Sequence, residues 1–378
     1  PRPYFPPRNW QNKIKTLHLQ KIGSNTYRNL TKRQQNYGKK TMTRKALHLI
    51  FTLSLAATAL AAHGQTSPSP DKQQRMLAEE KEFLANMKPG LQHTQMLAVR
   101  AAMNGDDTAL QQIRRSRNQT PALPEGVTAS YPTADLCLFT PSRTAARKRP
   151  LLLYLHGGGW CFGSINSCTR FCAALALEAD CCVAALDYRL APAHPYPAPL
   201  HDCQQALAFL RQHADEWGCD STRVSVGGDS AGGNLAIATA MSAKGVCKVI
   251  PIYPVTKLFS EQTASWQNYA KGYGNDAELL EAFNEAYARQ EERNPLVSVG
   301  LADDKALQSL PPILIISAGH DILFDQTAEL AQRLQRLNHP LSYHVYPTAT
   351  HLFITVPGQP TAFSEAVATI ANFLNDSE

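Results

Sequence analysis

Short apolar runs recur along the chain from residue 149 onward, and amphipathic stretches of helical length separate them. Uninterrupted runs of this length are typical of strands buried on both faces of a parallel sheet. The alternation predicts an α/β fold with a mostly parallel central sheet and helices on both faces. Strands are expected at 149–156, 181–189, 223–228, 247–254, 311–319 and 340–347, after a pair of edge strands within 127–141. Helices are expected at 167–180, 200–217, 231–243, 327–337 and 361–376.

Two stretches interrupt this alternation and predict a helical cap. Residues 72–104 have helical periodicity with a Pro-Gly break, and residues 255–300 are polar and aromatic with no strand pattern. An insertion as long as the second stretch usually forms a lid or a binding element. Ligands of such sheets bind at the carboxyl ends of the strands. We therefore expect cap elements at about 72–120 and 255–300 to cover that edge.

The formal net charge of +6 comes from the N-terminal segment. Residues 1–41 contain ten Lys and Arg residues and no Asp or Glu, and Arg44 and Lys45 add two more. The remaining chain therefore carries 6 − 12 = −6, which gives no reason to expect nucleic-acid binding. The chain has 378 residues, 44% of them hydrophobic, which is enough for one large domain.

Residues 42–64 have the parts of a secretory signal peptide: a first methionine, a basic pair, an apolar run and small residues at its end. A short membrane anchor is the alternative, but a membrane span needs ~20 apolar residues. We therefore expect export, to the periplasm or outside the cell, and no stable membrane insertion after cleavage. The expected organisation is upstream translated sequence without a fold at 1–41, the signal at 42–64, a linker at 65–71 and one domain at 72–378.

The chain contains nine cysteines, an odd number and many for an exported protein. No pair has zinc-finger spacing, so no metal site is predicted. Most of the cysteines lie in apolar runs, where cysteine behaves as a small buried hydrophobic residue. One or two disulfides are the alternative.

The stretch GGDSAGG contains the pattern G-x-S-x-G around Ser230, with Asp229 before it and Ala231 after it. The pattern alone is weak, but here a strand pattern precedes it and a helix pattern follows it. That context is typical of a nucleophilic serine on a strained turn, where flanking glycines allow the strand and helix to approach closely. An ordinary glycine turn is the alternative.

A nucleophilic serine needs a general base, and the base needs an acid that orients it. On this architecture the chain order is Ser, then Asp or Glu, then His. Asp321 follows the strand expected at 311–319, and His351 follows the last expected strand. The rivals are Asp325 as the acid, and His320 or His344 as the base.

The segment HGGGW, residues 156–160, ends the first buried strand with three glycines. Uncovered backbone N–H groups there, together with the N–H of Ala231, could stabilise a developing oxyanion. Gly158 and Gly159 are the expected donors, although a pair that includes Gly157 would also serve. His156 is expected to brace the loop. A phosphate loop is disfavoured, because no Gly-Lys-Ser/Thr or G-x-G-x-x-G pattern is present.

The ordered motifs HGGGW, DYRLAPAHPYPAPLHDC, GDSAGGN, AGHDILFD and HLF resemble those of the hormone-sensitive-lipase-like esterases of the α/β-hydrolase fold. The resemblance runs from about residue 72 to the C-terminus. It implies a serine carboxylesterase for short acyl chains with a helical cap and no cofactor. We expect a small ester as substrate and a monomer or homodimer as the assembly. Ser230, Asp321 and His351 fall on the family's catalytic positions. This chain departs from the family at three supporting positions. The family usually has Glu where Ala193 stands and near Gln326, and it often has Pro where Ile322 stands. These departures bear on cap anchoring and loop rigidity.

Aromatic residues near the motifs are candidates for a substrate pocket, although each could equally be core or lid packing. The candidates are Trp160, Tyr188, Phe259, Trp266 and Tyr269. Export favours an acetylated carbohydrate as one possible class of substrate. A peptidase or a non-catalytic binder on the same fold are the less favoured alternatives.

Mass spectrometry of the protein recovered from its natural host tests the predicted N-terminus. We expect a mature chain that begins at Ala62 or Gln65, because small residues precede both positions as signal peptidase requires. Peptides from residues 1–41 in that sample would contradict the prediction.

Overall fold

The computed structural model describes residues 69–376, and the expected signal peptide and upstream segment lie outside them. Within this range an eight-stranded sheet has the order β1-β2-β4-β3-β5-β6-β7-β8. The strands from β4 to β8 along this order pair in parallel, whereas β2 pairs antiparallel with both of its neighbours. The strands are β1 (Val127–Thr133), β2 (Leu136–Pro141), β3 (Arg149–Leu155), β4 (Cys182–Leu186), β5 (Cys219–Asp229), β6 (Val249–Ile252), β7 (Ile313–His320) and β8 (Leu341–Thr350).

Eleven α-helices lie within the described residues. They are α3 (Pro70–Ala85), α4 (Leu91–Met103), α5 (Thr108–Arg117), α6 (Ile165–Ala179), α7 (Ala198–His213), α8 (Ala231–Ser242), α9 (Ala264–Asn268), α10 (Ala277–Ala288), α11 (Asp304–Gln308), α12 (Phe324–Arg336) and α13 (Pro360–Asn375). Short 3-10 turns cover Ala214–Trp217 and Val299–Leu301. The predicted α/β fold with a mostly parallel sheet is confirmed.

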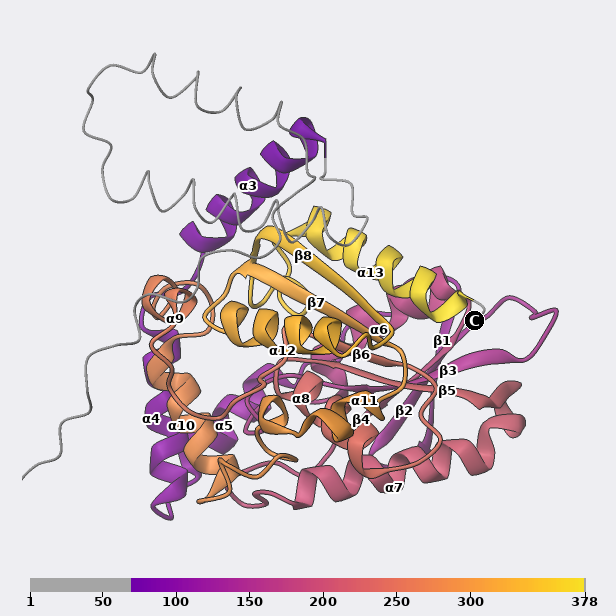
Figure 1. Cartoon of the computed structure of the whole chain (residues 1–378), viewed down its shortest axis with the longest axis horizontal. Coiled ribbons are helices and arrows are strands. Elements are labelled where there is room, and N and C mark those ends of the chain that lie inside the picture. Colours follow the sequence, from indigo (N-terminus) through magenta and orange to yellow (C-terminus); the bar gives the residue numbers. More distant parts are fainter. Residues whose placement is uncertain (1–68, 377–378) are drawn as a thin grey trace, which may run out of the picture. The chain divides into compact units, whose positions relative to one another are not determined.

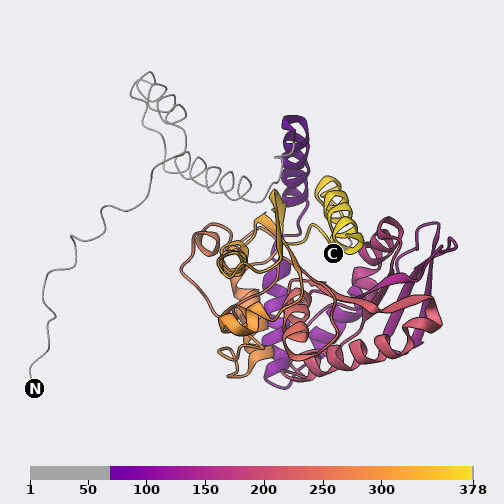
Figure 2. The ribbon, with the colours of Figure 1, turned by 45° about the vertical axis from the view of Figure 1, so that its right-hand side comes forward.

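Alternate side chains of the central strand β3 enter two separate cores. Leu151, Leu153 and Leu155 join the core under α7, α8 and α12, whereas Leu152 and Tyr154 join the core under α6 and α13. All of these side chains are at most 1% exposed, as expected for a strand that has helices over both faces. Figure 2 shows α13, in yellow, and α7, in rose, on opposite sides of the strands.

The observed elements differ from the expected ones mainly at their ends. Helix α3 begins at Pro70 with Ser69 as its N-cap, so the last two residues of the expected linker are helical. Helix α7 ends at His213, four residues before the expected end, and continues as a 3-10 turn. Of the expected edge pair only β1 is an edge, since β2 pairs on both sides.

The two cap stretches meet in space as α4 and α10 (Figure 1). Gln92 of α4 accepts a hydrogen bond from the N–H of Asp276, and a hydrogen bond between His93 and Glu278 and a surface ion pair between Arg100 and Glu285 also join the helices. Helix α3 instead packs against α13 and β8, where Glu79 accepts hydrogen bonds from the hydroxyl and the N–H of Thr361. No helix within residues 69–376 has the length and apolarity that a membrane span requires.

Candidate active site

Ser230 lies at the sharp turn between β5 and α8. Its backbone has φ 56° and ψ −116°, a conformation that side-chain-bearing residues rarely adopt. Neighbouring glycines make room for this turn, because a Cβ atom on Gly228 or Gly232 would collide with the carbonyl oxygen of Leu155 in β3. The expected strand-turn-helix context of the serine is therefore present, and it raises the hydroxyl at the carboxyl edge of the sheet.

A chain of hydrogen bonds connects the three residues selected from the sequence. His351 Nε2 lies 2.8 Å from Ser230 Oγ, and His351 Nδ1 lies 2.7 Å from Asp321 Oδ2. The N–H of Leu323 donates to the other oxygen of Asp321 at 3.0 Å, which fixes the carboxylate plane. The Ser230, His351 and Asp321 side chains are buried, and the ring of Tyr253 packs against the imidazole at 4.7 Å between centroids.

The rival acid and bases have other contacts. Asp325 lies in α12 and accepts a hydrogen bond from the N–H of Ser265 in the cap at 2.7 Å. His320 pairs with the buried carboxylate of Glu80 in α3. His344 lies within β8. The hydrogen bonds of Ser230 and His351 thus lead to Asp321 rather than to these residues.

The three glycines after β3 do not have equivalent N–H groups. The N–H of Gly157 donates to Asp229 Oδ1 at 3.0 Å, whereas no group among the described residues accepts from the N–H groups of Gly158, Gly159 or Ala231. Gly158 and Gly159 have φ values of 117° and 61°, which favour glycine. The pair Gly158 and Gly159 is thus available to a ligand oxygen, and Gly157 is not.

Asp229 and His156 brace this loop from behind. Asp229 Oδ1 also accepts from the hydroxyl of Tyr154 at 2.8 Å, and burial raises the pKa of this carboxyl. His156 hydrogen-bonds through Nδ1 with the carbonyl of Gly157, and burial lowers the pKa of the imidazole. The ring of Tyr188 stacks on His156 at 4.3 Å, and its hydroxyl donates to the His156 carbonyl.

The prediction that Trp160 and Tyr188 line the substrate pocket is wrong. Trp160 is fully buried and stacks on Tyr287 with 4.3 Å between the ring centroids. Tyr188 is also buried, since its ring stacks on His156 and its hydroxyl donates to the His156 carbonyl. The other aromatic candidates, Phe259, Trp266 and Tyr269, also lie outside the cavity wall. All five residues pack within the core or the cap.

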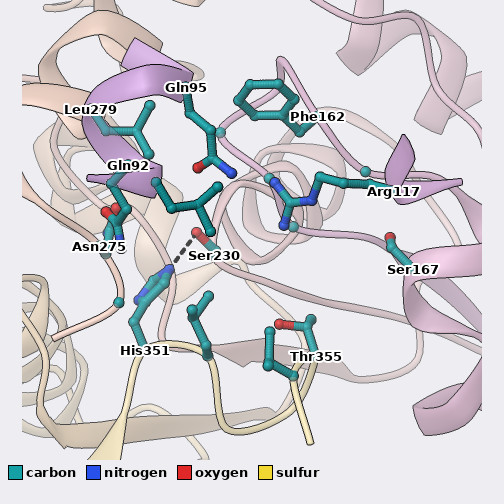
Figure 3. A pocket seen from close by; sticks show the side chains of 18 of the residues that line it. Gln92, Gln95, Arg117, Phe162, Ser167, Ser230, Asn275, Leu279, His351 and Thr355 are labelled. Atoms are coloured by element: carbon teal, nitrogen blue, oxygen red, sulfur yellow. Dashed lines mark hydrogen bonds between the residues drawn. The ribbon is translucent and has the colours of Figure 1, made fainter. Parts of the chain in front are cut away.

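A cavity of about 500 Å³ opens directly over Ser230 and His351 (Figure 3). Its floor includes Gly158 and Gly159, and its walls come from the end of α3, from α4, α5 and α10, and from the loop after His351. Both predicted cap stretches therefore border the site. Sequence reasoning missed most of the wall, namely Gln92, Gln95, Arg117, Phe162, Asn275 and Phe283.

Gln326 anchors the start of the second cap stretch, although the resembling family usually has Glu nearby. Its Oε1 accepts from the N–H groups of Thr256 at 2.6 Å and Lys257 at 2.9 Å. An amide oxygen accepts these bonds as a carboxylate oxygen would. With Gln326 where the family usually has Glu nearby, the cap therefore remains attached to α12.

All nine cysteines lie within the described residues as free thiols, and eight of them are buried. Burial raises the pKa of the Cys161 thiol to about 12, so this sulfur stays protonated. No group of three or more metal-ligating side chains occurs within residues 69–376.

Comparisons with known proteins agree with this fold. A profile of the α/β-hydrolase fold matches residues 152–355. The chain is 32% identical over 241 residues to esterase LipI of Mycobacterium tuberculosis, covering 62% of this chain and 75% of that protein. It is 30% identical over 253 residues to an acetyl esterase of Salmonella schwarzengrund, covering 65% of this chain and 77% of that protein.

A solved α/β-hydrolase enzyme from the metagenome of Lake Arreo has a similar fold, with a TM-score of 0.62 and 28% identity. The similarity covers 77% of this chain and 99% of the solved one. The chain belongs to the hormone-sensitive-lipase-like carboxylic ester hydrolases of the α/β-hydrolase fold.

Proposed function

We propose that this enzyme hydrolyses short-chain acyl esters through a covalent acyl-enzyme on Ser230. The observation that carries the proposal is the unbroken chain of hydrogen bonds from Ser230 through His351 to Asp321, with the serine open to the cavity. A serine hydroxyl becomes an effective nucleophile when an adjacent base takes its proton as the new bond forms.

In the proposed acylation step, His351 Nε2 accepts the proton of Ser230 while Oγ attacks the ester carbonyl. Asp321 accepts from Nδ1–H, so it holds the tautomer in which Nε2 is the base, and it stabilises the imidazolium that forms. His351 then gives the proton to the departing alkoxide, and the alcohol leaves. Water deprotonated by the same imidazole attacks the acyl-enzyme and regenerates the serine.

The oxyanion of each tetrahedral intermediate is proposed to accept hydrogen bonds from the N–H groups of Gly158, Gly159 and Ala231. These are the N–H groups at the cavity floor and the serine turn that no described residue occupies. Their positions are set before substrate arrives, since the backbone of this loop is braced by Asp229. One donor of this kind contributes ~10²–10³ to kcat.

Two observations support a short acyl chain. The cavity is about 500 Å³, and it must hold the alcohol part as well as the acyl part. Gln95 and Asn275 place unpaired polar groups in its wall, and burying an alkyl chain against such groups is unfavourable. One of the relatives is named an acetyl esterase.

A panel of p-nitrophenyl esters of increasing acyl length tests this preference. We expect kcat/KM to be highest for the shortest acyl groups and to fall as the chain lengthens, because long chains exceed the polar-walled cavity. The absorbance of the released p-nitrophenolate gives the rate of hydrolysis of each ester. A maximum at decanoate or beyond would contradict the short-chain assignment.

Replacement of the nucleophile provides the direct test of the mechanism. Ser230→Ala should lower kcat on p-nitrophenyl acetate by on the order of 10⁴-fold or more, because no other group can form the acyl-enzyme. A phosphonate probe should label the wild-type serine and not the variant. Ser242→Ala is the matched control, since this hydroxyl lies in the last turn of the same helix and bonds to the Ala238 carbonyl. Wild-type activity in Ser230→Ala would overturn the mechanism.

Asp321 and its rival Asp325 can be compared with one isosteric change. Asp321→Asn should lower kcat by on the order of 10⁴-fold, because the amide favours the wrong tautomer of His351. Asp325→Asn should have a much smaller effect, since this carboxylate bonds to the cap residue Ser265. Steady-state kinetics of both variants decide the matter, and equal losses or the reverse order would remove Asp321 from its proposed role.

A further inference from the structure

Three polar side chains of the cavity over Ser230 have no hydrogen-bond partner within residues 69–376. Gln95 and Asn275 are each only 6% exposed and line the cavity, and no described residue hydrogen-bonds to either amide. Arg117, at the end of α5, is the third, and its guanidinium likewise lacks a hydrogen bond or ion pair with any described residue. Figure 3 shows all three side chains pointing into the cavity, with Arg117 directed toward Ser230.

Unpaired polar groups of this kind are unusual in a folded protein. Buried amides and charges are normally hydrogen-bonded, because an unmet partner costs free energy. Nearby cavity-wall side chains follow the rule: Gln92 accepts from the N–H of Asp276, and Ser167 donates to the Ser164 carbonyl. Some buried side chains elsewhere in the described chain, such as Tyr287, also lack a partner. Gln95, Asn275 and Arg117 differ from their paired neighbours in the same wall, because they border the cavity without a hydrogen bond to any described residue.

Arg114 and Arg117 show the contrast within one helix. Arg114 donates to the carbonyls of Cys161 at 2.9 Å and Ala191 at 2.8 Å, so it is used to hold the loop after the glycines. For Arg117, three residues later, the one side-chain interaction with another described residue is with the ring of Phe162, whose centroid lies 5.5 Å from the guanidinium carbon. Arg117 as a whole residue is exposed to solvent, yet the protein around the cavity lowers the pKa of its guanidinium by desolvation, and no carboxylate counters that effect. An anion bound in the cavity would stabilise the charged guanidinium.

The cavity wall has more positively charged than negatively charged side chains. Lys88, Arg114 and Arg117 line it, whereas Asp229 is the one carboxylate among the lining residues. Asp229 is committed to the hydroxyl of Tyr154 and the N–H of Gly157. No acidic side chain in the described wall therefore stands ready to pair with Arg117, and the wall repels cations and favours anions.

We infer that the enzyme acts on esters that carry a carboxylate apart from the scissile ester, and that Arg117 binds this carboxylate with the amide of Gln95 beside it. A guanidinium forms paired hydrogen bonds with a carboxylate, a geometry that a neutral ester cannot offer. The carboxylate belongs either to the acyl part, as in a half-ester of a dicarboxylic acid, or to the alcohol part. The inference rests on the proposed function, since hydrolysis itself proceeds on Ser230.

Matched pairs of esters distinguish the two positions of the charge. The acyl arm compares mono-p-nitrophenyl glutarate with p-nitrophenyl pentanoate, and the alcohol arm compares para-acetoxybenzoate with para-acetoxybenzamide. Rates measured with Ser230→Ala serve as the blank for spontaneous hydrolysis. We expect the wild-type enzyme to prefer the anionic member of at least one pair by about tenfold or more in kcat/KM, as a charge-assisted hydrogen-bonded pair contributes.

Arg117→Met should lower the anionic-to-neutral ratio of kcat/KM in that arm by about ten- to hundredfold, mainly through KM. Arg117→Lys keeps the charge but not the paired geometry, so it should retain part of the preference. Arg115→Met is the control, because Arg115 lies in the same last turn, is exposed and is no part of the cavity wall. It removes the same charge near the helix C-terminus and should leave the ratio and the activity unchanged.

Rates on the neutral esters test the esterase mechanism independently of the anion site. Hydrolysis of the neutral esters by wild type but not by Ser230→Ala supports the proposed function by itself. If the wild type then shows no preference for either anionic ester, or if Arg117→Met and Arg115→Met change the ratio equally, the anion site is overturned and the esterase mechanism stands. Loss of binding for both members of a pair in a folded Arg117→Met, judged by circular dichroism, would likewise overturn the charge-specific role.

Discussion

One carboxylate connects the two segments on which the proposed chemistry depends. Asp229 Oδ1 accepts hydrogen bonds from the N–H of Gly157 and the hydroxyl of Tyr154, and 72 residues of chain separate Asp229 from Gly157. Since Asp229 immediately precedes Ser230, this bond sets the distance between the serine turn and the glycine loop. Gly228 and Gly232 allow the same approach from the backbone side. The proposed oxyanion donors and the proposed nucleophile are therefore positioned as one unit before any ester binds, which is the condition for electrostatic stabilisation of a transition state.

The cap is anchored through residues that adjoin the same unit. Gln326 lies five residues after Asp321 and holds the N–H groups at the start of the second cap stretch. His320, next to Asp321 in sequence, pairs with Glu80 of α3. The segment around Asp321, the proposed acid, thus contacts both cap stretches. Such shared anchors make the cavity wall a fixed surface relative to Ser230, so that substrate groups far from the ester bond can still be held in a defined position.

The sheet and the Ser230, Asp321 and His351 set could be predicted from the sequence for a common reason. Each of these residues comes directly after an apolar run, and the carboxyl ends of parallel strands meet at one edge. The cavity wall could not be predicted in this way. Arg117 and Gln95 lie on helices whose periodicity shows which face is buried but not which space that face borders. Trp160 and Tyr188 lie beside the motifs in sequence, yet their rings pack on Tyr287 and His156 behind the loop.

The unpaired polar side chains of the cavity wall lower the stability of the folded protein and, by our proposal, set its substrate specificity. A cavity that had only to receive a neutral alkyl ester would be more stable with apolar side chains at the positions of Gln95 and Asn275, since buried polar groups without partners weaken the folded state. Their free energy is recovered only when a ligand supplies the missing partners. Binding that depends on such groups rejects ligands without the matching charge more strongly than an apolar pocket rejects a misfit of shape. The proposed anion site would therefore make the cavity select substrates by charge, in addition to the limit on acyl length that we propose from its volume.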